Sequence, residues 1–106
     1  MSEELPRIPT EDGKIHVLLV YVEGDTETYV YLFTSKQAVE EFVVDGIKKY
    51  WEEFARDFHY AGEDLEEHRK TMEGVIDEAV KSLRERGLWN DGEGNTYVYD
   101  EKEWTA

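Results

Sequence analysis

The feature that most constrains the fold is a long amphipathic stretch, residues 34–60. Its apolar side chains recur at steps of three and four residues, which places them on one stripe of a helix of about seven turns. That stripe consists of Ala38, Val39, Phe42, Val43, Ile47, Tyr50, Trp51, Phe54 and Phe58. Charged side chains occupy the opposite side, and several of the apolar ones are large aromatic rings. The stretch therefore predicts a helix that needs another layer of structure to cover its stripe.

A second helix is predicted over residues 64–86, again with apolar residues on one face, ending in Leu83. Thr34 is the expected N-cap of the first helix and Asp64 that of the second, each with a capping-box partner three residues later. Gly87 follows the last turn, where glycine commonly ends a helix. Gly46 and Gly74 interrupt the helices, and we expect them where another element approaches closely.

Two β-strands precede the helices, over residues 14–22 and 28–33. Gly24 suits the first central position of a two-residue type II′ hairpin loop. Such a loop fixes the register, so that residues 20 and 29 face each other, as do 18 and 31.

The register sorts the hairpin side chains onto two faces. One face is aliphatic, and we assign it to the helices: Ile15, Val17, Leu19, Val30 and Leu32. The other is aromatic and half-polar, and we expect it to point away from the helices: Leu18, Val20, Tyr29, Tyr31 and Phe33.

A final strand is predicted over residues 96–99, with a further short strand at 88–90 as an option. The final strand could pair beside the first strand or beside the second. The sequence therefore predicts an α+β fold with the elements in the chain order β-β-α-α-β. In this fold a small antiparallel sheet carries a two-helix hairpin on one face. We expect one domain over residues 14–99, a flexible acidic N-terminal arm (1–13) and an acidic C-terminal tail (100–106).

Composition limits the function more than it defines it. The chain has 106 residues, no cysteine and a net charge of −14. No apolar run reaches the roughly 20 residues of a membrane span, so we expect a soluble, cytoplasmic protein. The charge argues against direct binding to nucleic acid or to an anionic membrane, and it favours basic partners.

The sequence contains little that indicates a catalytic site or a metal-binding site. His59 and His68 lie among acids around the expected interhelical turn, but their spacing matches no ligand pattern. The loop 90–95 suggests calcium, yet in EF-hand register its first and last ligand positions fall on Gly87 and Val98. There is no cysteine nucleophile and no glycine-rich phosphate cradle. We therefore expect that the protein is not an enzyme and binds no metal or cofactor. The less favoured alternative is a small metal-binding or ligand-binding enzyme that uses the His59–His68 region.

Two sets of residues remain as candidate partner-binding groups. The aromatic set could share the outer sheet face, unless the terminal arms cover it: Tyr29, Tyr31, Trp89, Tyr97, Tyr99 and Trp104. The acidic set lies beside it, and its alternative role is solubility: Glu23, Asp25, Glu27, Asp91, Glu93, Asp100, Glu101 and Glu103.

In size, acidity and absence of cysteine and catalytic motifs, the chain is similar to small phage-encoded inhibitors of host defence, such as anti-restriction and anti-CRISPR proteins. Some of these mimic DNA. The similarity is one of composition and carries over no residue. It implies a non-enzymatic protein that blocks a basic, nucleic-acid-binding surface of a partner protein, with the acids steering and the aromatic rings anchoring. The alternative is a self-associating structural domain that pairs through the aromatic sheet face. The chain is expected to be either a monomer or a homodimer.

Overall fold

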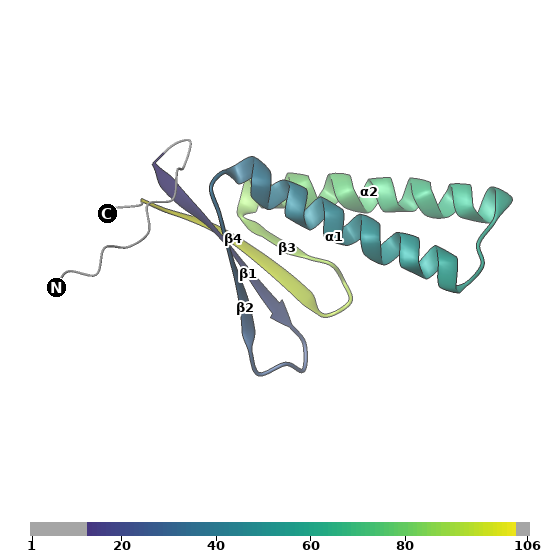
Figure 1. The fold of residues 1–106 in the computed structure, drawn as a ribbon, viewed down its shortest axis with the longest axis horizontal. Helices are drawn as coiled ribbons and strands as arrows, with labels where there is room; N and C mark the ends of the chain where they lie inside the picture. Colours follow the sequence, from purple (N-terminus) through teal and green to yellow (C-terminus); the bar gives the residue numbers. More distant parts are fainter. Residues whose placement is uncertain (1–12, 104–106) are drawn as a thin grey trace.

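The structure, a computed structural model, describes residues 13–103. Its elements, in chain order, are β1 (Lys14–Val22), β2 (Thr28–Phe33), α1 (Lys36–Asp57), α2 (Gly62–Arg86), β3 (Leu88–Asn90) and β4 (Asn95–Glu103). The strands form one antiparallel sheet in the order β2-β1-β4-β3, and both helices lie on the same face of it (Figure 1). The predicted α+β class is therefore confirmed.

The sheet includes the optional short strand and places β1 between β2 and β4. Of the two placements left open, the last strand pairs beside the first strand. Strand β4 also runs on to Glu103, which lies opposite Lys14, so the acids of residues 100–103 are part of the sheet. In the described part of the chain, neither helix is long and apolar enough to cross a membrane.

The β1–β2 register is the predicted one: Leu18 faces Tyr31 and Val20 faces Tyr29. The turn itself differs from the prediction. The Asp25 amide donates to the Val22 carbonyl at 3.0 Å, which makes Gly24 the third residue of the turn. Gly24 has a φ of 88°, as a type II turn requires at that position.

Both predicted helix N-caps are wrong by a few residues. Ser35, not Thr34, has the extended backbone of an N-cap, and its hydroxyl accepts from the Ala38 amide at 3.1 Å. Helix α2 begins at Gly62, so Asp64 lies inside the first turn, where a carboxylate still interacts favourably with the helix dipole. Helix α1 ends at Asp57, and the left-handed residue after it is His59, with a φ of 55°.

The predicted end of the second helix is confirmed, and it is tied to the sheet. Gly87 has a φ of 65°, and its amide donates to the Leu83 carbonyl at 3.0 Å. Its own carbonyl accepts from the Tyr99 amide at 2.8 Å. By contrast, a Cβ added at Gly46 or Gly74 would meet nothing within 4 Å, so the close approach expected at these glycines is wrong.

The assignment of the two sheet faces is also wrong. Leu18 and Val20 pack into the helices, in one buried cluster that also contains Val39, Val43, Ile47, Met72, Ala79, Leu83 and Trp89. Phe33, Tyr97 and Tyr99 lie against the same cluster, so the aromatic face is the one that the helices cover. The aliphatic face points away from the helices, with Val30 and Leu32 exposed on it, while Ile15 at its far end is buried. Because β1 is apolar on both sides, its alternation cannot choose between them, and the larger rings bury more area against the helices.

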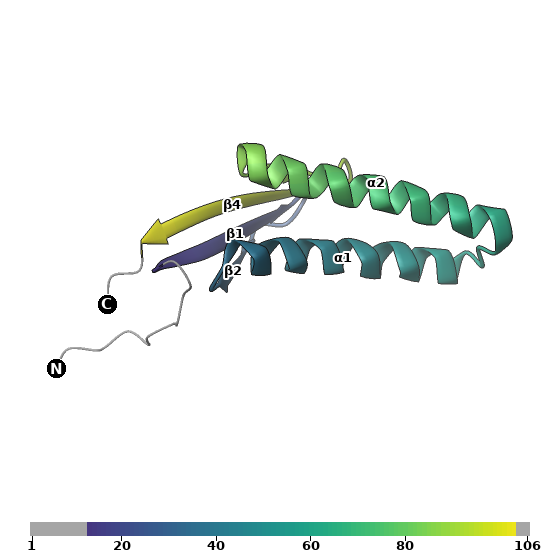
Figure 2. The same ribbon diagram turned by 90° about the horizontal axis from the view of Figure 1, so that it is seen from above.

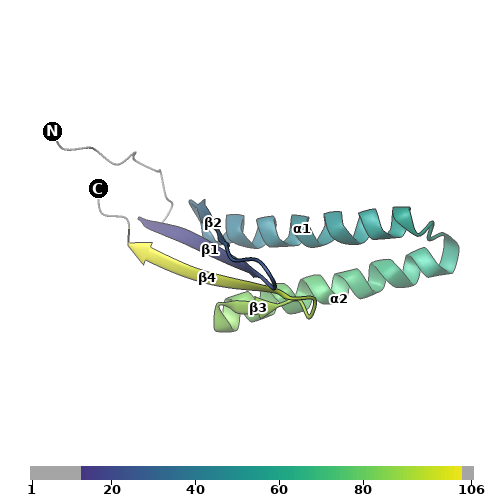
Figure 3. The ribbon, with the colours of Figure 1, turned by 90° about the horizontal axis from the view of Figure 1, so that it is seen from below.

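The molecule is elongated, because the helices are longer than the sheet beneath them. Its extents are 61 × 31 × 23 Å, and its radius of gyration is 16.8 Å, where a compact chain of this length has about 13 Å. Figures 2 and 3 show the helical hairpin projecting past the sheet at the end where α1 turns into α2. The distal turns of the hairpin therefore pack helix against helix only.

Candidate functional site

Two turns distant in sequence meet at one end of the sheet. Asn95 lies opposite Val22, and the Glu23 amide donates to the Gly94 carbonyl at 2.7 Å. This contact joins the β1–β2 turn to the β3–β4 turn and gathers five of the eight predicted acids: Glu23, Asp25, Glu27, Asp91 and Glu93. We call this region the acidic turn end.

The other three predicted acids lie at the opposite end of β4, roughly 20 Å away at about 3.3 Å per residue. There, Asp100 pairs with Lys102 at 3.3 Å and Glu101 pairs with Lys14 at 3.4 Å, while Glu103 is exposed. The structure therefore divides the acidic set into two separate groups, of which one is largely balanced by lysines.

A cavity of about 160 Å³ lies between α1, α2 and the β3–β4 turn at the acidic turn end. Its walls combine aromatic rings, carboxylates and aliphatic residues: Gly46, Ile47, Tyr50, Trp51, Val75, Trp89, Asp91, Glu93, Asn95 and Tyr97. We call it the acidic aromatic pocket. It brings together four of the residues predicted from the sequence, namely Trp89, Asp91, Glu93 and Tyr97.

Two stacked rings line the sheet side of the pocket. Trp89 and Tyr97 are cross-strand partners of β3 and β4, and their rings stack with centroids 5.2 Å apart. Trp89 is buried in the core, while Tyr97 is only half-buried. On the helix side, Gly46 has no side chain to fill the opening, and a Cβ there would meet nothing within 4 Å.

The two carboxylates of the pocket have different roles. Asp91 holds the turn together: its Oδ1 accepts from the amides of Glu93 at 2.8 Å and Asn95 at 3.1 Å, and its Oδ2 accepts from the Asn95 side chain at 2.7 Å. Glu93 lies on the exposed crest of that turn, next to Tyr50 of α1. Glu93 is therefore the carboxylate that can turn toward a ligand.

The phenols near these carboxylates stay protonated at physiological pH. A hydrogen bond to Glu93 and the negative charge of that carboxylate raise the pKa of Tyr50. Burial, and then the charge of Asp91, raise the pKa of Tyr97. A hydrogen bond to Asp25, at 3.1 Å, raises that of Tyr29. A pocket of carboxylate oxygens and neutral aromatic rings attracts cations, and the residues that line it include no lysine, arginine or histidine.

The remaining aromatic candidates lie elsewhere. Tyr99 packs against the helices, and its hydroxyl is 2.6 Å from Nδ1 of the buried His16. Tyr29 and Tyr31 are 42% and 37% exposed at the sheet edge, where Tyr31 contacts Phe42. Trp104 lies outside the described residues.

Sequence reasoning missed Tyr50 and Gly46 as site residues. It placed Tyr50 on the buried stripe and Gly46 at a helix crossing. Tyr50 is in fact 51% exposed, at the margin of the stripe where α1 passes the β3–β4 turn. A tyrosine at the edge of an apolar stripe is the one signal in the sequence that could have suggested it, since its hydroxyl requires a polar partner.

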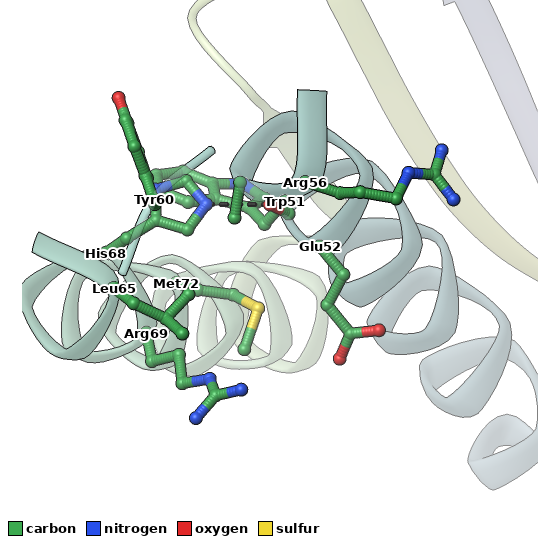
Figure 4. A pocket seen from close by; sticks show the side chains of 9 residues that line it. Trp51, Glu52, Arg56, Tyr60, Leu65, His68, Arg69 and Met72 are labelled. Carbon is green, nitrogen blue, oxygen red and sulfur yellow. Dashed lines mark hydrogen bonds between the residues drawn. The ribbon is translucent and has the colours of Figure 1, made fainter. Parts of the chain in front are cut away.

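A second cavity, of about 310 Å³, lies between the helices near the tip of the hairpin (Figure 4). His68 donates from Nε2 to the Trp51 carbonyl at 2.7 Å, and its ring packs on those of Trp51 and Tyr60. The guanidinium groups of Arg56 and Arg69 point outward in different directions. Charges do not converge here, and among residues 13–103 no group of three or more His, Cys, Asp or Glu could hold a metal ion.

A comparison with known protein families finds no match for this chain, and neither does a comparison with curated proteins or with solved structures.

Proposed function

We propose that the chain is a non-enzymatic interaction protein that binds a basic segment of a partner protein and blocks it, with a lysine or arginine side chain entering the acidic aromatic pocket. The observation that supports this most is the meeting of Glu93 with the rings of Tyr50 and Tyr97 around one cavity. Carboxylate oxygens pair with the cationic head, and aromatic rings contact both its charge and its aliphatic stem.

The surroundings of the pocket support the same class of partner. Residues 23–27 and 91–94 contain all five acids of the acidic turn end and no lysine or arginine. Such a one-signed region accelerates the encounter with a basic surface, and its effect decreases as salt is added. Binding of this kind is expected to weaken steeply between low and high ionic strength.

Mimicry of nucleic acid is a narrower form of the same proposal. It needs carboxylates spaced along a surface like phosphates on a strand, and a partner whose basic groove they fill. The acids lie in two groups at opposite ends of the sheet, so the pocket favours recognition of one basic side chain over imitation of a long backbone. Competition with duplex DNA separates the two forms.

The direct test uses short peptides as probes. We would titrate the isotope-labelled chain with trilysine and with triarginine and follow the amide and indole signals by NMR. The expected result is a saturable change confined to Tyr50, Trp89 and residues 91–95, several-fold weaker in Glu93→Gln and weaker at high salt. The matched control is Glu66→Gln, which removes the same charge from an exposed position on α2. Equal losses of peptide affinity in both variants, or signal changes spread over every acidic surface, would refute the proposal that the pocket is the binding site.

The natural partner can then be sought by affinity capture from a host lysate. A basic protein retained by the wild type and by Glu66→Gln, but lost with Glu93→Gln, is the expected result. If duplex DNA displaces that protein, the partner uses a nucleic-acid-binding surface; if DNA has no effect, the blocked surface is of another kind.

A further inference from the structure

The sheet presents a second surface, unconnected with the pocket, on the side away from the helices. Val30 and Leu32 of β2 are 57% and 58% exposed there. The register places Val30, Leu19, Val98 and Leu88 in one row across all four strands, since each faces the next. Val17 and Leu32 form the adjacent row. We call this surface the open sheet face.

The open sheet face is electrically neutral in a chain of net charge −14. Within residues 13–103, the charged side chains that alternation places on this face of the strands are Asp100, opposite Val17, and Lys102, opposite Ile15. These two form an ion pair at 3.3 Å, near one end of β4. A contiguous aliphatic surface without net charge is unusual for a monomer and typical of an interface.

We infer that the open sheet face is the interface of a homodimer, with two copies packed sheet against sheet about a two-fold axis. Charge does not oppose a second copy of this chain as the occupant, because the face itself is neutral. Packed sheets lie about 10 Å apart, and a helical layer adds about 10 Å on each side, so the helices of the two copies would be roughly 30 Å apart. That is several Debye lengths at physiological salt, about 8 Å each, and the acidic helices would hardly repel each other.

Charge also selects the direction of the axis. The end of the sheet opposite the acidic turn end is nearly balanced in charge, because Lys14 and Lys102 pair there with Glu101 and Asp100, and Glu103 is exposed. A two-fold axis perpendicular to the strands sets this nearly balanced end of one copy against the acidic turn end of the other. An axis parallel to the strands would place the two acidic turn ends together, which like-charge repulsion disfavours.

The available area predicts a weak dimer. Four strands about 4.8 Å apart, paired over at most eight or nine residues, offer roughly 400–500 Å² per copy. The total, roughly 800–1,000 Å², lies below the size of stable interfaces and in the range of weak ones, so we expect association only at micromolar or higher concentrations.

The test is the mass of the full-length chain by sedimentation equilibrium, from low to high micromolar concentration. The expected result is a monomer–dimer equilibrium that high salt leaves unchanged or strengthens, because the face is neutral and salt screens the small repulsion that remains between the acidic copies. Binding of a basic partner in the pocket would respond to salt in the opposite direction, so the two proposals can fail independently. A chain that remains monomeric at every concentration and salt would overturn the inference, and so would a dimer that high salt dissociates.

Matched variants locate the interface. Val30→Lys places a charge in the aliphatic row, at its end on the exposed edge strand β2, and should weaken association at least tenfold. Phe58→Lys makes the same charge change at a residue that is 62% exposed on the hairpin tip, and it should leave association intact. Equal effects of the two would overturn the assignment to the sheet. Should Val30→Lys lower the melting temperature, intermolecular methyl contacts between Val98 and Leu32 in a mixed-labelled wild-type sample decide the question: their presence supports the face, and their absence from a dimer refutes it.

Discussion

At the scale of single residues, tyrosine hydroxyls and carboxylates define the candidate site. Tyr50 and Glu93 come from elements separated by 43 positions in the chain, and the pKa of Tyr50 is raised first by a hydrogen bond to Glu93 and then by its charge. A raised pKa means that the folded state favours the neutral phenol. The contact therefore contributes to stability below the ordinary tyrosine pKa, about 10, and is lost as the pH rises through the higher folded value.

We predict that Glu93→Gln lowers the pKa of Tyr50 toward the ordinary tyrosine value, because the amide has no charge to oppose the phenolate. The measurement is an NMR titration of the tyrosine ring carbons at alkaline pH, with Tyr50→Phe identifying the signal. Tyr29 provides the internal control, since its pKa is raised by Asp25 and should not change. An unchanged Tyr50 titration in the Glu93→Gln protein would mean that the two groups do not interact in solution.

At the scale of elements, the start of α1 depends on one hydroxyl. The Ser35 side chain accepts from the Ala38 amide, one of the amides that the first turn leaves without a helical partner. We predict that Ser35→Ala lowers the free energy of unfolding by about 1 kcal/mol, the usual cost of removing an N-cap. Urea denaturation gives this value directly.

The neighbouring Thr34 is the matched control, because it carries the same kind of hydroxyl one residue earlier and accepts no helical amide within the described contacts. Thr34→Ala should change stability by no more than a few tenths of a kcal/mol. A larger loss from Thr34→Ala than from Ser35→Ala would place the cap where the sequence pattern alone put it.

The elements that sequence could predict are those fixed by local chemistry. The β1–β2 register follows from a short glycine turn, the end of α2 from Gly87, and the helical layer from the stripe of apolar residues. The choice of sheet face is different, because Val17 and Leu18 are equally suited to burial. Only the packing of distant rings such as Trp89 against both helices decides it.

The acidic aromatic pocket could likewise not be predicted from short segments of the sequence. Its acids and two of its rings could be predicted as candidates, since Asp91, Glu93, Trp89 and Tyr97 are close in sequence. Their partner Tyr50 is marked in the sequence only by its place at the edge of the apolar stripe, because its contact with them depends on where α1 passes the β3–β4 turn. That crossing is set by strand order and by the length of both helices, which no short segment encodes.

At the scale of the whole molecule, the layers are unequal in length. The sheet supports α1 and α2 near the buried cluster, and the hairpin tip extends past it (Figure 2). At the tip, rings pack on one another between the helices: Phe54 lies 4.4 Å from Phe58 and 5.8 Å from His68, between ring centroids. Phe58 is nevertheless 62% exposed, whereas Val39 and Val43, over the sheet, are 1% and 3% exposed.

This inequality predicts a gradient of local stability along the hairpin. Amides of residues 52–68 should exchange with solvent faster than those of residues 39–47 and 76–83, because the tip can open without disturbing the sheet. Hydrogen exchange followed by NMR under native conditions, repeated at low urea concentrations, measures this. Exchange at the tip should depend little on urea, as expected for a local opening that exposes little surface. Uniform protection along both helices, with a common urea dependence, would instead show that tip, sheet and helices unfold as one cooperative unit, and that the rings between the helices hold the tip as firmly as the sheet holds the rest.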